Sequence, residues 1–245
     1  MSKDDHNNKD PLRTIRLMWD PPPPPSRGPK GRLSVDRIVD SAIRLADQAG
    51  TASLSMRQVA ADLECGTMSL YTYISSKAEL IELMVDRVHA EITAPDQQLD
   101  WRGQVFALAL QQWQLYHRHP WILESNLVRL SLGPSYLDAA ELLVSALERL
   151  GLAPGDIQQS MAAINSYVHG AARSDMLSRE ASMRSGVSAG EFSKAREEFW
   201  SSYFDLDRYP AHTRLWTFGA LNDSRDPFEF GLNRLLDGIE RLKGH

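Results

Sequence analysis

Two short helical patterns separated by a tight turn constrain this sequence more than any other feature. Ser55 is followed three residues later by Gln58, a capping box that begins a helix expected over residues 56–63. Gly66 interrupts the pattern as the natural turn residue, and a second short helix is expected over residues 67–73. Two short helices joined by a glycine-containing turn are typical of a helix-turn-helix, whose second helix enters the major groove of DNA.

A longer helix is expected on each side of this pair. Before it, apolar residues recur at helical spacing over residues 35–49, Ser34 precedes them as a cap, and Gly50 follows as a helix-ending residue. After it, Ser76 and Glu79 form a second capping box, which begins a helix that runs to about residue 93. We therefore expect a three-helix DNA-reading unit and a helix that links it to the rest of the chain.

Helical periodicity continues through the remaining sequence and predicts an all-α protein. The apolar stripes that recur at helical spacing cover residues 101–119, 135–150, 154–177, 188–203 and 226–242. Ser135 is expected to cap the second of these helices, while residues 178–187 and the segment around Pro210 are expected to be loops. The sequence contains no alternation typical of β-strands and no glycine-rich phosphate loop.

Charge is divided unevenly along the chain, whose net charge is −5. Residues 1–77 contain 11 Lys and Arg against 9 Asp and Glu, and residues 78–245 contain 16 against 23. Basic charge therefore gathers where the helix-turn-helix lies, as a DNA-reading unit requires. The absence of an apolar run of 18 residues and of a signal peptide, together with the single Cys65, leads us to expect no membrane span, no internal disulfide and a cytoplasmic location.

Residues 1–32 are expected to form a flexible, proline-rich basic arm. Five consecutive prolines at residues 21–25 favour a stiff polyproline II spacer. Arg27, Lys30 and Arg32 follow it, separated by glycine and proline. Two interpretations stay open: a solvated leader, or an arm that lies in the minor groove beside the second short helix.

Several segments around the helix-turn-helix match a known family. They are Ala42, Leu45, Gly50 and the segments LSMRQVAADL, SLY and SKAEL. Over residues 33–83 the chain thereby resembles the DNA-binding domain of the tetracycline-repressor family of bacterial transcription regulators. The resemblance implies a helix-turn-helix DNA-binding domain over residues 33–78 and a larger helical ligand-binding and dimerisation domain over residues 79–245. One residue departs from the pattern, since Glu64 stands where the family usually has glycine.

The resemblance also implies which side chains contact DNA. These positions are Met56, Arg57, Thr67, Met68, Ser69, Tyr71, Thr72, Tyr73 and Lys77. Their chemistry agrees with this role, because Arg57 can form a bidentate pair with guanine or bind a phosphate, and Tyr71 and Lys77 suit phosphate oxygens. Tyr73 could equally pack against neighbouring helices.

The second domain is larger than dimerisation requires, which favours a small-molecule cavity between its helices. The candidate lining residues are Trp113, His117, Trp121, Asn126, Asn165, His169 and Trp200, each of which could instead belong to the core. Alignment with the family founder puts Thr93, Leu108 and Gln112 where drug-contacting His, Asn and Phe stand, so tetracycline is not the expected ligand. His117 and His119 do not share one helical face, so no metal or other cofactor is expected.

A single three-helix reader is usually too small for specific affinity, so a homodimer on a palindromic operator is expected. The resemblance implies that the 154–177 helix and the last helix form a four-helix bundle across the two-fold axis. The interface candidates are Ala162, Ser166, Gly170, Phe228, Gly231 and Leu235. The alternative is that both helices serve only the core of one chain.

The leading hypothesis is a ligand-responsive, homodimeric transcriptional regulator, with repression as its expected action. A small-molecule effector would release the operator by shifting the helix that follows Ser76. The alternative is a family member that acts as an architectural or division-associated DNA-binding protein without a ligand. An enzyme is not expected, because the sequence has no nucleophile elbow, no paired carboxylates in a defined frame and no metal-ligand spacing.

Overall fold

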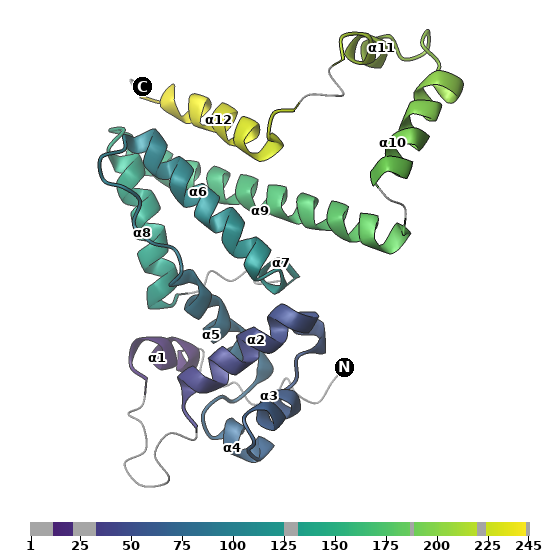
Figure 1. The fold of residues 1–245 in the computed structure, drawn as a ribbon. Helices are drawn as coiled ribbons and strands as arrows, with labels where there is room; N and C mark the ends of the chain where they lie inside the picture. The colour runs from purple at the N-terminus through teal and green to yellow at the C-terminus, as the bar shows by residue number, and fades with distance from the viewer. Residues whose placement is uncertain (1–11, 22–32, 125–131, 187–188, 220–223, 244–245) are drawn as a thin grey trace.

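The computed structural model describes residues 12–21, 33–124, 132–186, 189–219 and 224–243. All regular structure in these ranges is helical, which confirms the expected all-α fold (Figure 1). None of these helices has the length and apolar character that crossing a bilayer requires. The helix-turn-helix lies at one end of the molecule and the larger body at the other (Figure 1).

Four helices make up the DNA-reading unit and its link to the body. They are α2 (Val35–Ser53), α3 (Met56–Asp62), α4 (Thr67–Tyr71) and α5 (Lys77–His89). Ser34, Ser55 and Ser76 each accept a hydrogen bond from the backbone N–H three residues on, so all three expected caps are confirmed. Gly50 leaves the helical conformation with φ 73° and ends the regular part of α2 as predicted.

The turn between α3 and α4 is built differently from the sequence-based expectation. Gly66 was the expected turn residue, yet it has φ −74° and acts as the N-cap of α4. Glu64 instead takes the left-handed conformation, with φ 52°. A side chain in this conformation costs roughly 1–2 kcal/mol relative to glycine, because its Cβ crowds the following carbonyl oxygen. The turn therefore keeps its shape at some cost in stability.

The hydrophobic core of the reader extends beyond the expected boundary at residue 78. Leu80 and Met84 of α5 are completely buried together with Ile38, and Leu115 and Trp121 from the body join the same core. Helix α5 is thus part of the reader as well as its link to the body. The boundary of the two domains runs through a continuous core.

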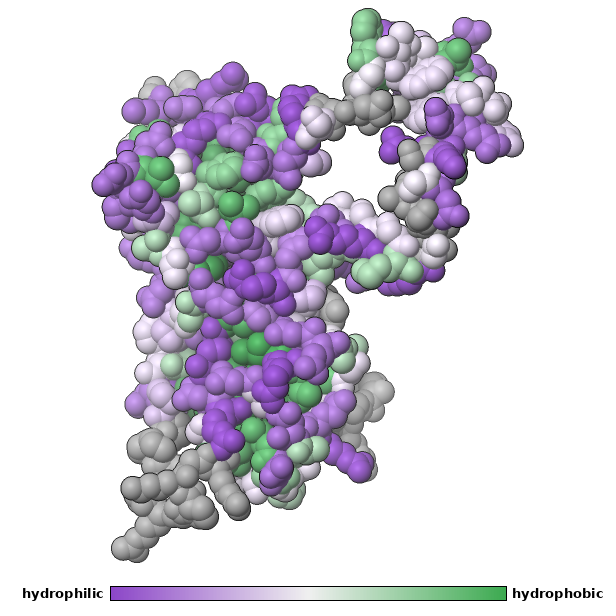
Figure 2. All heavy atoms as spheres, viewed as in Figure 1, coloured by the Kyte–Doolittle hydropathy of each residue, from purple (hydrophilic) through white to green (hydrophobic). Residues whose placement is uncertain are grey.

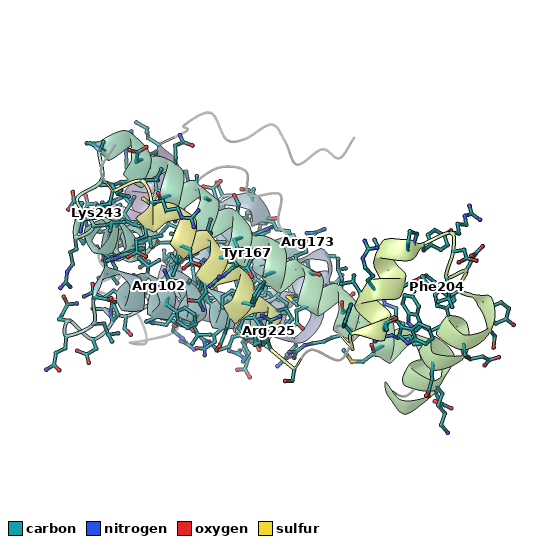
Figure 3. All side chains as sticks on the ribbon, turned by 90° about the horizontal axis from the view of Figure 1, so that it is seen from above. Arg102, Tyr167, Arg173, Phe204, Arg225 and Lys243 are labelled. Carbon is teal, nitrogen blue, oxygen red and sulfur yellow. The ribbon has the colours of Figure 1, made fainter. Side chains whose placement is uncertain are left out.

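Five helices form the body. They are α6 (Trp101–Arg118), α7 (Trp121–Glu124), α8 (Pro134–Glu148), α9 (Pro154–Ser185) and α12 (Pro227–Glu240). Their core contains Val105, Leu147, Ile164 and Leu232, each at most 1% exposed. Arg102 ties α6 to α12 by donating to the Asp237 carboxylate at 2.7 Å (Figure 3).

Two helix boundaries in the body differ from the prediction. Helix α8 begins two residues earlier, because Gly133 is its N-cap and Pro134 its first residue, rather than Ser135 acting as the cap. Helix α9 continues to Ser185, so residues 178–185 are helical and not a loop. An ion pair between Arg184 and Glu180, one turn apart, supports this polar extension.

Residues 189–219, the arm, extend away from the body beyond the end of α9 (Figure 1). The arm contains α10 (Ala189–Glu198), a π-helical turn η2 (Phe199–Tyr203) and α11 (Pro210–Thr217). Pro210 begins a helix as its N1 residue, where the sequence predicted a loop. Figure 2 shows apolar surface on the arm, and Tyr203 and Phe218 are 75% and 82% exposed.

A short helix, α1 (Arg13–Trp19), lies within residues 1–32, the N-terminal segment that was expected to be flexible. It packs beside α5 (Figure 1), with Thr14 only 5% exposed and with Leu17 and Met18 against the reader core. Residues 1–11 and 22–32, which include Arg27, Lys30 and Arg32, lie outside the described residues.

Replacing Glu64 with glycine should stabilise the protein. Glycine adopts the left-handed conformation without the Cβ clash, but it loses more conformational freedom on folding. Glu64→Gly should therefore raise the free energy of unfolding by up to about 1 kcal/mol. Glu64→Ala is the matched control, because it removes the same carboxylate but keeps the Cβ atom. Urea unfolding of both variants measures the difference, and equal stabilities would contradict the role of the left-handed turn.

His89 should make the stability fall in mild acid. Burial of the His89 ring between α5 and α8 lowers the pKa of His89 below the ordinary value of 6.5. Its Nδ1 lies 2.7 Å from the Val85 carbonyl oxygen. The unfolded state then takes up a proton that the folded state resists, so stability is full above pH 6.5 and is lost as the pH falls below it.

One such proton gives a slope of at most about 1.4 kcal/mol per pH unit. His89→Gln should flatten the fall in stability between about pH 7 and pH 5, measured by urea unfolding at each pH. Parallel curves for the variant and the wild type would show that His89 does not cause the fall.

Candidate DNA interface and ligand pocket

Helix α4 presents an exposed face of short polar and larger side chains. Leu70 is completely buried and anchors the helix to the reader core, while Met68 and Tyr71 are 79% and 43% exposed. Ser69 and Thr72 are also exposed, and the Thr72 hydroxyl donates to the Met68 carbonyl at 3.4 Å. A helix that carries such groups at the end of a molecule has the layout of a major-groove reader.

The predicted DNA-contacting residues are divided by their burial. Arg57, at the start of α3, is exposed, and Thr67 is half-buried. Met56 is only 6% exposed and packs in the reader core, so its side chain is not available to DNA and that prediction is corrected. Tyr73 is half-buried against the same core. The Lys77 ammonium donates to the Thr51 carbonyl oxygen at 2.6 Å, so part of its hydrogen-bonding capacity serves the end of α2.

Asp62, the last residue of α3, holds this helix against α2. Its carboxylate accepts a hydrogen bond from the Ser41 hydroxyl at 2.6 Å and forms an ion pair with Arg44. The hydrogen bond from Ser41, and after it the hydrogen bond from Arg44, hold the pKa of Asp62 below its ordinary value. Sequence reasoning missed this contact, because 21 residues separate the partners and no local pattern connects them.

A pocket of roughly 600 Å³ lies between α6, α9 and α12. Its lining residues are Trp113, Ser166, Tyr167, Gly170, Ala171, Ser174, Asp175, Asp226, Pro227 and Phe228. The Phe228 ring lies 5.3 Å from Trp113 and 5.9 Å from Tyr167, so three aromatic rings form one wall. Two carboxylates and two serine hydroxyls provide polar groups, which suits a flat molecule with hydrogen-bond donors.

Tyr167 holds α12 against α9 at the edge of this pocket (Figure 3). Its hydroxyl donates to the Phe228 carbonyl oxygen at 2.9 Å, and burial raises its pKa. A Cβ atom added to Gly231 would lie 2.2 Å from the Tyr167 hydroxyl oxygen. The close approach at Gly231 therefore occurs within one chain, and its place in a dimer interface stays a prediction.

His117 positions a carboxylate at the pocket edge. Its Nε2 lies 2.7 Å from the Asp175 carboxylate and its Nδ1 lies 2.8 Å from the Trp113 carbonyl oxygen. Arg179 also reaches the Asp175 carboxylate, at 2.8 Å. His117 and Arg179 thus fix the orientation of the Asp175 carboxylate beside the cavity. Sequence reasoning missed Tyr167 and Asp175 as pocket residues, although their spacing of about two helical turns places both on one face of α9.

Among the predicted ligand-binding residues that the structure describes, only Trp113 and His117 lie together at the pocket, with ring centroids 3.9 Å apart. Asn165 and His169 are exposed on α9 and do not line the pocket. Trp200 lies in the arm, with its ring 4.4 Å from that of Phe204. Asn126 lies outside the described residues.

Trp121 was predicted to line the pocket but is completely buried in the reader core. Its indole N–H donates to Asp47 of α2 at 2.7 Å. His119 lies beside it, with its two ring nitrogens 2.7 Å from the Asp47 carboxylate and 2.9 Å from that of Glu91. Partial burial raises the pKa of Glu91, but hydrogen bonds from His119 and Arg118 bring it below the ordinary value. These residues join the body to the reader.

The remaining interface candidates fall into two groups. Phe228 is 7% exposed and Leu235 is half-buried, and both pack in the core of the body. Ala162, Ser166 and Gly170 are exposed along α9, and a Cβ atom added to Gly170 would meet no atom within 4 Å. The second group is therefore the more exposed of the two.

Replacing Gly231 with alanine should destabilise the protein. The new Cβ atom would push the Tyr167 ring away and weaken its hydrogen bonds to α12, at a cost of about 1–3 kcal/mol. Gly238→Ala, on the same helix, is the matched control, because a Cβ atom there would meet nothing within 4 Å. Thermal unfolding compares the two, and equal midpoints would contradict the tight contact at Gly231.

The comparison with known proteins covers both parts of the chain. Residues 38–84 match the family described as bacterial regulatory proteins, tetR family, and residues 94–242 match the tetracyclin repressor-like C-terminal domain. The HTH-type transcriptional repressor DrrR1 of Streptomyces coeruleorubidus is 42% identical over 234 residues, which cover 94% of this chain and 86% of that protein. An HTH-type transcriptional regulator of Saccharopolyspora erythraea is 32% identical over 184 residues, which cover 74% and 77%.

A solved structure agrees with these matches. ActR from Streptomyces coelicolor, in complex with actinorhodin, has a TM-score of 0.71 and 26% identity, and the alignment covers 88% of this chain and 100% of ActR. Since the family matches span the helix-turn-helix and the helical body alike, this protein belongs to the tetR family of bacterial transcription regulators.

Proposed function

We propose that the protein is a homodimeric transcriptional repressor that binds a palindromic operator and releases it when a small molecule binds. The observation that carries the proposal is α4, whose exposed Met68, Ser69 and Tyr71 project from a buried anchor at Leu70. Family membership supports DNA binding, and a relative at 42% identity is named a repressor, which supports repression.

Arg57 and the α4 face would read the operator together. The guanidinium of Arg57 can donate two parallel hydrogen bonds to a guanine in the major groove, or bind a phosphate. Ser69 and Thr72 can donate to base edges or to the backbone, and Tyr71 suits a phosphate oxygen. The Met68 side chain can contact a thymine methyl group.

Two exposed surfaces support the homodimer. Small residues on α9, namely Ala162, Ser166 and Gly170, would let a second helix approach closely. Apolar side chains on the arm add exposed surface of the kind that marks protein–protein contact. A dimer would place two α4 helices on half-sites separated by about 34 Å, one turn of DNA, or by a multiple of it.

The pocket between α6, α9 and α12 is the proposed effector site. Its aromatic wall and its carboxylates Asp175 and Asp226 suit a flat molecule with donor groups. ActR, which was solved in complex with actinorhodin, supports a small-molecule effector by its similarity. Tetracycline is not the proposed effector, given Thr93, Leu108 and Gln112 at the aligned contact positions.

Arg57→Ala should weaken operator binding by about 1–3 kcal/mol if the side chain reads a base, with relaxed preference at one position of the site. If it binds a phosphate instead, the loss should be uniform over sequences and the salt slope should fall by about one. Arg234→Ala, an exposed arginine on α12, is the control and should leave affinity unchanged. An Arg57 variant with unaltered affinity and specificity would contradict the proposed interface.

The function is tested by selecting bound genomic DNA and then screening small molecules for release of the selected operator. Trp113→Ala should keep operator affinity but lose release, because it removes part of the aromatic wall. Leu137→Ala, at an exposed position of α8 outside the pocket, should keep both. Failure to select a palindromic site would overturn the repressor, whereas operator binding that no compound alters would favour a DNA-binding protein without a ligand.

A further inference from the structure

Helix α1 lies outside both segments that match the family, residues 38–84 and 94–242. It nevertheless packs against α5 in the DNA-reading unit. The Arg13 guanidinium crosses to that unit, where its Nε donates to Glu79 at 3.0 Å and its Nη2 donates to the Tyr73 carbonyl oxygen at 3.3 Å. Arg13 thus contacts both sides of the connection between α4 and α5.

Glu79 is a buried carboxylate whose side chain is 1% exposed. Besides Arg13, it accepts hydrogen bonds from the backbone N–H and the hydroxyl of Ser75, the latter at 2.7 Å. Ser75 lies in the turn that carries the chain from α4 into α5. The Glu79 carboxylate therefore fixes this turn, and Arg13 supplies the charge that makes its burial tolerable.

The other end of α1 reaches the body. The indole N–H of Trp19 donates to the Leu132 carbonyl oxygen at 2.7 Å, immediately before α8. Between the two ends, Thr14 is buried and Leu17 and Met18 pack against the reader core. One short helix is thereby attached to the turn behind the recognition helix and to the entrance of the body.

We propose that α1 is a positioning element for operator binding: Arg13, acting through Glu79, sets the orientation of α4, and Trp19 ties that orientation to the body. The inference rests on the proposed DNA-binding function and assigns a role to residues outside the family domains. Arg13 acts inside the protein and not on DNA, because its guanidinium is already engaged by Glu79 and by the Tyr73 carbonyl oxygen.

The two roles of a basic residue predict different salt dependence. A mutation that removes a phosphate contact lowers the slope of log affinity against log salt concentration by about one. A mutation that removes a positioning residue lowers the affinity at every salt concentration and leaves this slope unchanged. Rescue adds a second distinction, since neutralising the buried partner should restore a positioning defect but not a lost DNA contact.

The test measures operator affinity of the full chain by fluorescence anisotropy at several salt concentrations, on the DNA selected for the wild type. Arg13→Gln should lose about tenfold or more in affinity with an unchanged salt slope, because it leaves the Glu79 charge buried without its partner. Arg13→Lys should lose less, since it keeps the charge. The double variant Arg13→Gln with Glu79→Gln should recover most of the loss.

Arg16→Gln is the matched control, because it removes an equal charge from an exposed position of the same helix and should bind as the wild type does. Wild-type affinity in Arg13→Gln overturns the inference while leaving the proposed function intact. A reduced salt slope without rescue by Glu79→Gln overturns it in favour of a direct DNA contact. A wild type that selects no DNA would instead overturn the proposed function itself.

Circular dichroism establishes whether each variant folds. If Arg13→Gln does not fold, Arg13→Lys and the double variant decide the matter. Operator affinity of both variants within about fivefold of the wild type supports the inference. Arg13→Lys keeps a positive charge beside the Glu79 carboxylate, and the double variant removes the carboxylate charge, so neither leaves that charge buried and unpaired. Loss of binding in the double variant contradicts it.

Discussion

The burial of α5 on two sides is the constraint on which the rest of the structure depends. At its N-terminal end, Leu80 and Met84 are completely buried against the reader helices. At its C-terminal end, the buried His89 packs edge-on against Tyr136 of α8, with ring centroids 5.0 Å apart. Because close-packed cores repack between discrete arrangements and do not deform continuously, α5 cannot shift without moving either the recognition helix or the body.

Polar contacts also hold the parts of the chain together across the same junction. Trp121 donates to Asp47, the Tyr136 backbone N–H donates to the Asp86 carboxylate at 3.0 Å, and Trp19 donates to the Leu132 carbonyl. The first two contacts join a residue of the reader to a residue of the body, and the third joins α1 to the body. Within the reader, Asp62 holds α3 on α2 through Ser41, so the helices that would meet DNA move as one unit. The junction therefore transmits displacement instead of absorbing it.

What could be predicted from the sequence was local, and what could not was long-range. The caps at Ser34, Ser55 and Ser76 lie within three residues of their partners, so the pattern identifies them. Helix α1 has no side-chain cap and only seven residues, and its ion pair joins residues 66 positions apart, so no local signal announces it. The same holds for the site: Met56 was expected to contact DNA and Trp121 to line the pocket, but no sequence pattern shows the distant neighbours that bury them.

The position of the pocket restricts how a ligand could act on DNA. Its walls come from α6, α9 and α12, and none of its lining residues belongs to the reader. Helix α6, however, carries Trp113 on the pocket wall and ends at Arg118, directly before His119 and Trp121. A ligand that displaces Trp113 would turn this helix as a rigid body, and the buried Trp121 would carry the motion to Asp47 of α2. The differential affinity of a ligand for the two arrangements of α6 then sets how far the operator-bound population can shift.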